Sequence, residues 1–333
     1  MKKIIGILLL FIVLCAVTTA VNPRFLSQAN LTNLANQIGM FGLFSIGAGL
    51  VIITSGIDLS VGSMIALTGV LLCMELSDWH WPWPLAVLSI LLLPSILGWI
   101  HGVLITRTNL QPFIVTLCGL LLYRGLARFI AKDSTKGFGD AKGIEWLRFA
   151  ASGRLFQMVD SATGKDSFSG IPMPFVILIV VAAIAWVALH WSVYGRYLFA
   201  IGRNEEAARF SGINTRRVVT SAYVISGLLA GVSGIVFAFY TNSVSPSTYG
   251  NFYELYGIAA AVLGGCSLRG GEGSILGIVI GTAILQVLQN LVNLLGIPSS
   301  LNFAVMGAVV LVGVLADQLL QNRARKRLAR ARS

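Results

Sequence analysis

Long apolar stretches with few charged residues recur along nearly the whole chain, and they restrict its fold more than any other feature. Only helices and closed barrels satisfy their backbone hydrogen bonds in lipid, and a helix of about 20 apolar residues crosses the hydrocarbon core. The sequence therefore predicts an all-α polytopic membrane protein of about ten transmembrane helices, some short or broken. The predicted crossings lie at about 4–21, 38–54, 60–76, 84–105, 112–131, 173–190, 218–240, 252–266, 274–293 and 301–318.

The composition agrees with a chain that lies mostly in lipid. Of 333 residues, 56% are hydrophobic and 11% are charged, whereas soluble domains carry about 25% charged residues. We predict one transmembrane domain at 1–320 and a basic tail at 321–333. The sequence contains no G-x-x-x-x-G-K-[ST] loop and no metal-binding spacing of cysteine or histidine. We therefore expect no enzyme activity, no metal, no cofactor and no nucleic-acid partner for this chain.

The basic residues predict the orientation. Ten crossings place both termini on one side, and lysine and arginine are enriched on the cytoplasmic side. Most basic residues lie in the terminal segments and in the connection 191–218, so these are expected in the cytoplasm. The connection 132–171, in which acids nearly balance the bases, is then a periplasmic loop. It would either receive a partner or act as a flexible lid.

The amino-terminal stretch allows two interpretations. It combines two lysines, an apolar run and small residues, as cleaved signal peptides do. Its uncharged run Ile4–Val21 is also just long enough to cross the hydrocarbon core. Of these two, we favour an uncleaved first span.

The connection 191–218 contains a short helix, "NEEAARFSG", with signals at both ends. Asn204 is suited to cap its first N–H groups, and Gly212 to end it in a left-handed conformation. Acids suit the positive end of the helix dipole, and Glu205 is placed to pair with Arg209. A solvated loop would explain the arginines but not this capped helix with apolar residues beside the membrane. We predict that it docks into a partner through Asn204, Glu205, Glu206, Ala207, Ala208, Arg209, Phe210 and Gly212.

At this point the chain resembles a known family. "YGRYLFAIGRNEEAARFSGINTRRV…YVISGLLAGVSGIVFA" is similar to the ATPase-coupling loop and following span of bacterial ABC sugar permeases of the ribose type. "TSGIDLSVGSMIALTGV", "QPFIVTLCGLLLYRGLARFI" and "AAVLGGCSLRGGEGSILGIVIGTAIL" resemble further motifs of that family. The chain departs from the family pattern at Thr54, Gln289 and Leu291.

The resemblance implies the membrane subunit of a monosaccharide importer in the bacterial cytoplasmic (inner) membrane. It implies a second permease copy, identical or paralogous, and a periplasmic sugar-binding protein outside. It further implies that a separate cytoplasmic ATPase subunit hydrolyses ATP and receives the helix at 204–212 in a cleft.

Asp58 is an acid between two apolar runs. A carboxylate in the middle of a membrane helix costs about 2.5–3.5 kcal/mol on insertion scales. It therefore caps a broken helix, lines a cavity or pairs. Gly56 and Gly62 loosen the helix, and we favour Asp58 or Ser60 as a cap for the segment that starts near Val61. Contact with a sugar hydroxyl and proton coupling stay open, and Ser63 belongs to the same candidate pathway.

Four uncharged amides lie at positions i, i+3, i+4 and i+7, on one face of a predicted helix. They either join helices or line a wet cavity for a polyol, and neither alternative is favoured by the sequence. They are Gln286, Gln289, Asn290 and Asn293. The segments 55–63 and 268–277 are weakly similar in sequence, which makes them a candidate internal repeat.

Three other functions are weighed against a sugar importer. A branched-chain amino-acid permease of the ABC class is disfavoured by "GIDLSVGS" and by the amides. An ATP-independent channel or secondary transporter would need ion-coupling acids inside the spans, whereas Glu75, Glu254 and Asp317 lie near span ends. A membrane scaffold would tolerate apolar residues in place of the amides.

Overall fold

The computed structural model describes residues 2–139, 141–159 and 166–298, and a few isolated positions from 301 to 311. The predicted crossing at 301–318 lies mostly outside the described residues, and the tail at 321–333 lies entirely outside them. The described α-helices are α1 (Lys2–Val21), α2 (Gln28–Ile53), α3 (Val61–Cys73), α4 (Trp83–Thr108), α5 (Pro112–Ala131), α6 (Glu145–Ser152), α7 (Met173–His190), α8 (Val193–Arg203), α9 (Glu205–Phe210), α10 (Thr215–Thr241), α11 (Tyr253–Leu263) and α12 (Ile275–Leu294). Two short helical turns, η1 (Pro23–Leu26) and η2 (Met74–Asp78), follow α1 and α3.

Eight helical segments of the described residues are long and apolar enough to cross a bilayer, which confirms the all-α polytopic class. The predicted crossing at 252–266 corresponds to α11, which has only 11 residues and is too short to span the hydrocarbon core alone. α2 begins ten residues before its predicted apolar run, because the polar segment from Gln28 to Gln37 continues the same helix.

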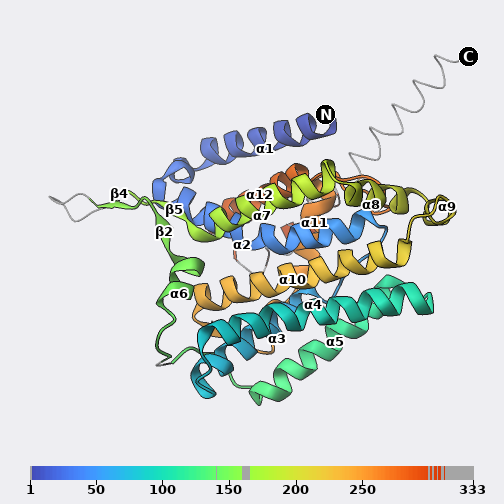
Figure 1. The fold of residues 1–333 in the computed structure, drawn as a ribbon. Helices are drawn as coiled ribbons and strands as arrows, with labels where there is room; N and C mark the ends of the chain where they lie inside the picture. Colours follow the sequence, from blue (N-terminus) through green and yellow to red (C-terminus); the bar gives the residue numbers. More distant parts are fainter. Residues whose placement is uncertain are drawn as a thin grey trace, which may run out of the picture.

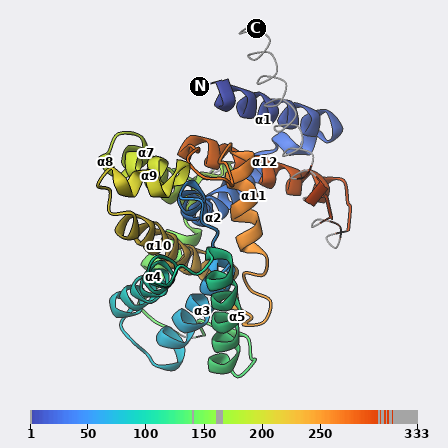
Figure 2. The same ribbon diagram turned by 90° about the vertical axis from the view of Figure 1, so that its right-hand side faces the viewer.

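α2 lies at the centre of the bundle. α10 packs along α2 and α4, while α7, α11 and α12 contact other sides of α2 (Figures 1 and 2). α1 lies at the outside, where it contacts α12, and only Thr18 of its described side chains is buried. Burial of α2 follows from this arrangement, because neighbouring helices surround it on several sides.

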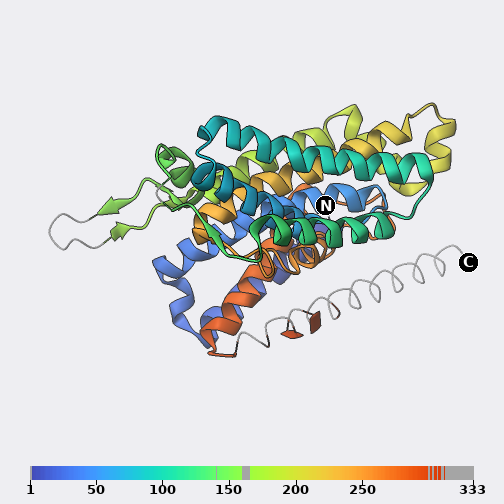
Figure 3. The same cartoon turned by 90° about the horizontal axis from the view of Figure 1, so that it is seen from below.

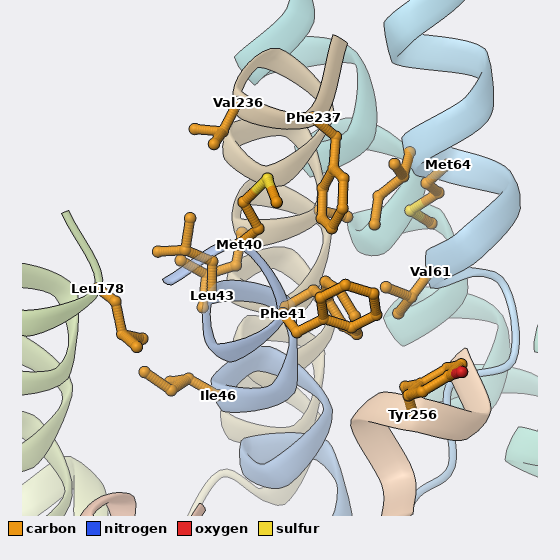
Figure 4. Packing of buried hydrophobic residues seen from close by; sticks show 14 of the residues in the cluster. Met40, Phe41, Leu43, Ile46, Val61, Met64, Leu178, Val236, Phe237 and Tyr256 are labelled. Atoms are coloured by element: carbon orange, nitrogen blue, oxygen red, sulfur yellow. The ribbon is translucent and has the colours of Figure 1, made fainter. Parts of the chain in front are cut away.

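The packing between α2, α3 and α10 is apolar and close. Figure 4 shows Met40 and Phe41 of α2 beside Phe237 of α10, with Met64 of α3 next to them. The rings of Phe41 and Phe237 meet edge to face, with centroids 5.3 Å apart. This core holds together the helices that carry the buried polar residues described below.

The connection 132–171 and α9 lie at opposite ends of the helices (Figures 1 and 3), as the predicted orientation requires. In the first, α6 packs against α10, so this part of the connection lies on the bundle. Its strands form antiparallel pairs, namely β1 (Lys136–Gly137) with β6 (Ser243–Val244), β2 (Arg154–Leu155) with β5 (Ile171–Pro172), and β3 (Met158–Val159) with β4 (Asp166–Phe168).

Candidate functional site

The predicted short helix at 204–212 is present as α9, and both of its ends are closed as expected. The side-chain oxygen of Asn204 accepts a hydrogen bond from the N–H of Ala207 at 2.9 Å. Gly212 has φ +83°, and its N–H donates to the carbonyl of Arg209 at 3.0 Å. The local signals therefore suffice to define this helix, because each closing group lies within three residues of its partner.

The outer surface of α9 carries Phe210, whose residue is 79% exposed, together with the exposed Ala207, Glu205 and Glu206. Two expectations for this helix are wrong. Ala208 is only 4% exposed, because α9 folds back against α8 and α10.

The second correction concerns Arg209. Its guanidinium carbon lies 5.8 Å from the ring centroid of Phe210, and within the described part of the chain no ion pair joins it to Glu205. The arginine therefore stacks with the exposed aromatic ring next to it in the sequence. Together they form one cationic and aromatic surface, the combination that is enriched in binding interfaces.

Asp58 lies in the non-helical segment 54–60, between α2 and α3, and is 2% exposed. Its Oδ1 accepts hydrogen bonds from the N–H and the hydroxyl of Ser60, at 3.0 and 2.6 Å. Its Oδ2 accepts one from the hydroxyl of Ser226 on α10, at 2.9 Å. Asp58 therefore shapes the turn before α3 and joins it to α10.

The cap of α3 differs from the prediction. Ser60 precedes the first residue of α3 and its carbonyl accepts the N–H of Met64 at 2.8 Å, but neither its side chain nor that of Asp58 accepts an N–H of the helix. The carboxylate of Glu254, on α11, instead lies beside the first turn of α3, at Gly62. A Cβ on Gly62 would lie 2.3 Å from Oε2 of Glu254, so only glycine allows this approach. Ser63 donates back to the carbonyl of Ser60 at 2.8 Å and so stabilises the same turn.

Further polar groups surround the segment 54–60. The carbonyl of Ile57 accepts hydrogen bonds from the hydroxyls of Thr116 on α5, at 3.2 Å, and Tyr223 on α10, at 3.4 Å. On α4, Nε2 of the buried His101 lies 2.8 Å from the hydroxyl of Tyr123. Helices α4, α5 and α10 thus supply polar groups to one region beside Asp58.

Sequence reasoning placed Glu75 and Glu254 near span ends and gave them no role. Both are buried, at 4% and 7% exposed. Oε2 of Glu75 accepts a hydrogen bond from the hydroxyl of Ser89 on α4 at 2.6 Å. The sequence feature that could have pointed to both residues is an acid inside or at the start of an apolar run. The same feature identifies Asp58.

The four amides of α12 do not form one continuous lining. Asn290 exchanges two hydrogen bonds with Asn30 of α2, at 3.1 and 2.7 Å, and so joins two helices. Gln286 is buried, Gln289 is half-buried and Asn293 is exposed. Nε2 of Gln286 has no hydrogen-bond partner. Of the two alternatives, helix joining holds for Asn290, and a wet lining remains a hypothesis for the others.

A cavity of about 610 Å³ lies at the other end of α3, away from Asp58. Its lining includes Asp78 and Lys136, which form an ion pair at 2.9 Å. This pair joins the connection 132–171 to η2. Among the described residues, no group of three His, Cys, Asp or Glu side chains is arranged to hold a metal ion.

Residues 30–314 match the sequence profile of a family described as branched-chain amino acid transport system / permease component. The chain is 39% identical over 321 residues to the ribose import permease protein of Bacillus subtilis (strain 168), covering 96% of this chain and 93% of that protein. It is 37% identical over 318 residues to the ribose import permease protein of Escherichia coli (strain K12), covering 94% and 93%. It is 30% identical over 364 residues to the xylose transport system permease protein of the same strain, covering 96% and 91%. No solved structure matches the chain.

Proposed function

The chain belongs to the family of branched-chain amino acid transport system permease components, and from this premise we propose that it is the membrane subunit of an ABC importer for a monosaccharide. One observation carries the choice of substrate. The similarity to the two ribose import permeases extends over more than nine-tenths of this chain and of each relative. The similarity to a xylose permease of nearly the same extent supports a pentose or a related sugar.

The buried polar groups suit a neutral cargo. Both carboxylate oxygens of Asp58 accept hydrogen bonds from serine groups, and the carboxylate of Glu254 packs against Gly62 at the start of α3. These acids are therefore engaged in the fold and present no ready site for a cationic cargo. The buried amide nitrogen of Gln286, which has no hydrogen-bond partner among the described residues, offers a donor of the kind that a polyol needs.

Energy for transport is proposed to come from a separate ATPase subunit. The sequence holds no phosphate-binding loop of its own. α9 supports this proposal, because it is a capped helix that presents Phe210 and Arg209 to the outside of the chain. A second permease copy and a periplasmic sugar-binding protein complete the proposed importer.

Two alternatives have a specific observation in their favour. The family description names branched-chain amino acids, which favours a permease for leucine-like cargo. The burial of Glu75 and Glu254 beside that of Asp58 favours an ion-coupled transporter more than the sequence alone does. The sugar importer and these two alternatives predict different results in a single uptake assay.

The deciding experiment is reconstitution in proteoliposomes. The chain would be incorporated with and without its ATPase and sugar-binding protein, and uptake of radiolabelled ribose, xylose and leucine would be measured. We expect uptake of a sugar only when ATP and both partners are present. Leucine uptake under these conditions would support the amino-acid permease, and sugar uptake by the chain alone, driven by an ion gradient, would contradict the importer.

A further inference from the structure

The carboxyl end of α8 meets two other segments directly beside α9. The N–H of Gly271, in the glycine-rich segment before α12, donates to the carbonyl of Ile53 at the end of α2, at 2.9 Å. The hydroxyl of Ser55 lies 3.1 Å from the carbonyl of Gly202 in α8 and 2.9 Å from that of Arg269. Three segments that are far apart in the sequence therefore meet at one point, which we call the junction.

The junction has no room for a Cβ at its glycines. A Cβ on Gly202 would lie 1.9 Å from the carbonyl oxygen of Ile53 and 2.3 Å from the N–H nitrogen of Gly271. Gly270 and Gly271 have φ +80° and +72°, in the region that favours glycine. A Cβ on Gly271 would also lie 2.9 Å from the backbone nitrogen of Arg203. Backbone therefore packs directly on backbone, and this contact cannot shift without moving all three segments.

Each segment at the junction leads to an element of the proposed importer. Gly202 lies three residues before Glu205, the first residue of α9. Ser55 lies three residues before Asp58, and Gly271 four residues before Ile275, the first residue of α12. A close-packed contact of this kind transmits displacement, because it has no free volume to absorb it.

We propose that the junction of Ser55, Gly202 and Gly271 couples movement of α9 to the Asp58 turn and to α12. These are positioning residues, since they act through other parts of the chain and need not touch the cargo. The inference rests on the proposed function and adds the route by which force on α9 reaches the pathway. The segments 55–63 and 268–277, which are weakly similar in sequence, also meet here near their beginnings, where Ser55 contacts the carbonyl of Arg269.

The test compares transport with ATP hydrolysis in the complete reconstituted complex. Gly202→Ala places a methyl group in the junction, and Ser55→Ala removes one hydroxyl while leaving the backbone unchanged. We expect the ATPase to co-purify with both variants as with the unmodified chain. The amount of ribose taken up per ATP hydrolysed should fall about tenfold in Gly202→Ala and about threefold in Ser55→Ala.

Gly125→Ala in α5 is the matched control, because no atom lies within 4 Å of the added Cβ, and its uptake per ATP should be unchanged. A normal ratio in Ser55→Ala would overturn the inference, even if Gly202→Ala failed to fold. Loss of ATPase binding in Ser55→Ala would also overturn it, since the residue would then serve docking. Absence of ATP-driven uptake by the unmodified complex would instead overturn the proposed function.

Discussion

The carboxylate of Asp58 accepts a hydrogen bond from the hydroxyl of Ser226, which lies 168 positions later in the chain, at 2.9 Å. Both side chains are buried, so neither group has water as a replacement partner. The bond joins the non-helical segment 54–60 to α10. Movement of α10 relative to α3 must therefore either carry this turn with it or break the bond.

Ser226→Ala removes the hydrogen bond that α10 donates to Oδ2 of Asp58. We expect the free energy of unfolding to fall by about 1–3 kcal/mol, because a buried acceptor is left without its partner. Uptake should fall with it. Thermal unfolding in detergent and uptake in proteoliposomes measure the two effects.

Ser233→Ala is the control for this variant. Ser233 is buried on the same helix, but its hydroxyl donates to the carbonyl of Leu229 in its own helix, at 2.7 Å. Its replacement should leave uptake unchanged. Equal losses in the two variants would mean that the bond to Asp58 has no special role.

Phe210→Ala removes the most exposed apolar side chain of α9. We expect binding of the ATPase to weaken at least about tenfold, as for a central aromatic contact in an interface, with no change in thermal stability of the chain. Phe129→Ala in α5 is the control, because Phe129 is 81% exposed and lies away from α9. ATPase binding, measured by co-purification and titration, should be normal in the control. Equal binding by both variants would contradict docking through α9.

Reversing the charges of Glu205 and Arg209 together should also abolish ATPase binding and uptake, while the chain still inserts in the membrane. These two residues do not pair with each other, so the double reversal acts on the partner surface and not on an internal ion pair. Membrane fractionation and co-purification check the two parts of this prediction. Normal uptake with a bound ATPase would count against it.

Glu254→Gln keeps a polar side chain of the same shape beside Gly62 at the start of α3, whereas Glu254→Leu places an apolar group beside the first N–H groups of that helix. We expect uptake to persist in the glutamine variant. The leucine variant should lose about 1–3 kcal/mol of stability. Glu145→Gln, at an exposed acid of α6, is the control. If Glu254 carried protons for an ion-coupled transporter, the glutamine variant would lose uptake completely.

Asn290→Ala removes the amide pair that joins α12 to α2. Paired polar side chains between membrane helices contribute about 0.6–2 kcal/mol to stability. We expect the free energy of unfolding to fall by an amount in this range. A double-mutant cycle with Asn30→Ala isolates the pair, and Asn293→Ala on the exposed part of α12 is the control. Additive losses from Asn30→Ala and Asn290→Ala would show that the amides do not act together.

The sequence by itself determined the class of fold, the course of most helices and the short helix α9. These features depend on groups that are close in the chain, such as an apolar run or the bond from Ala207 to Asn204. The outward direction of Phe210 was also predictable. The inward direction of Ala208 was not, because it depends on how α9 folds back on α8 and α10.

Only the tertiary structure decided the partners of the buried polar groups. Asp58 was recognised as an acid that shapes a break in a helix, but its bond to Ser226 joins residues from different helices. Glu254 of α11 came to lie beside the start of α3, and Asn290 became the partner of Asn30, for the same reason. In a membrane protein each buried donor and acceptor needs a partner inside the fold, and which one it finds is set by the packing of distant helices.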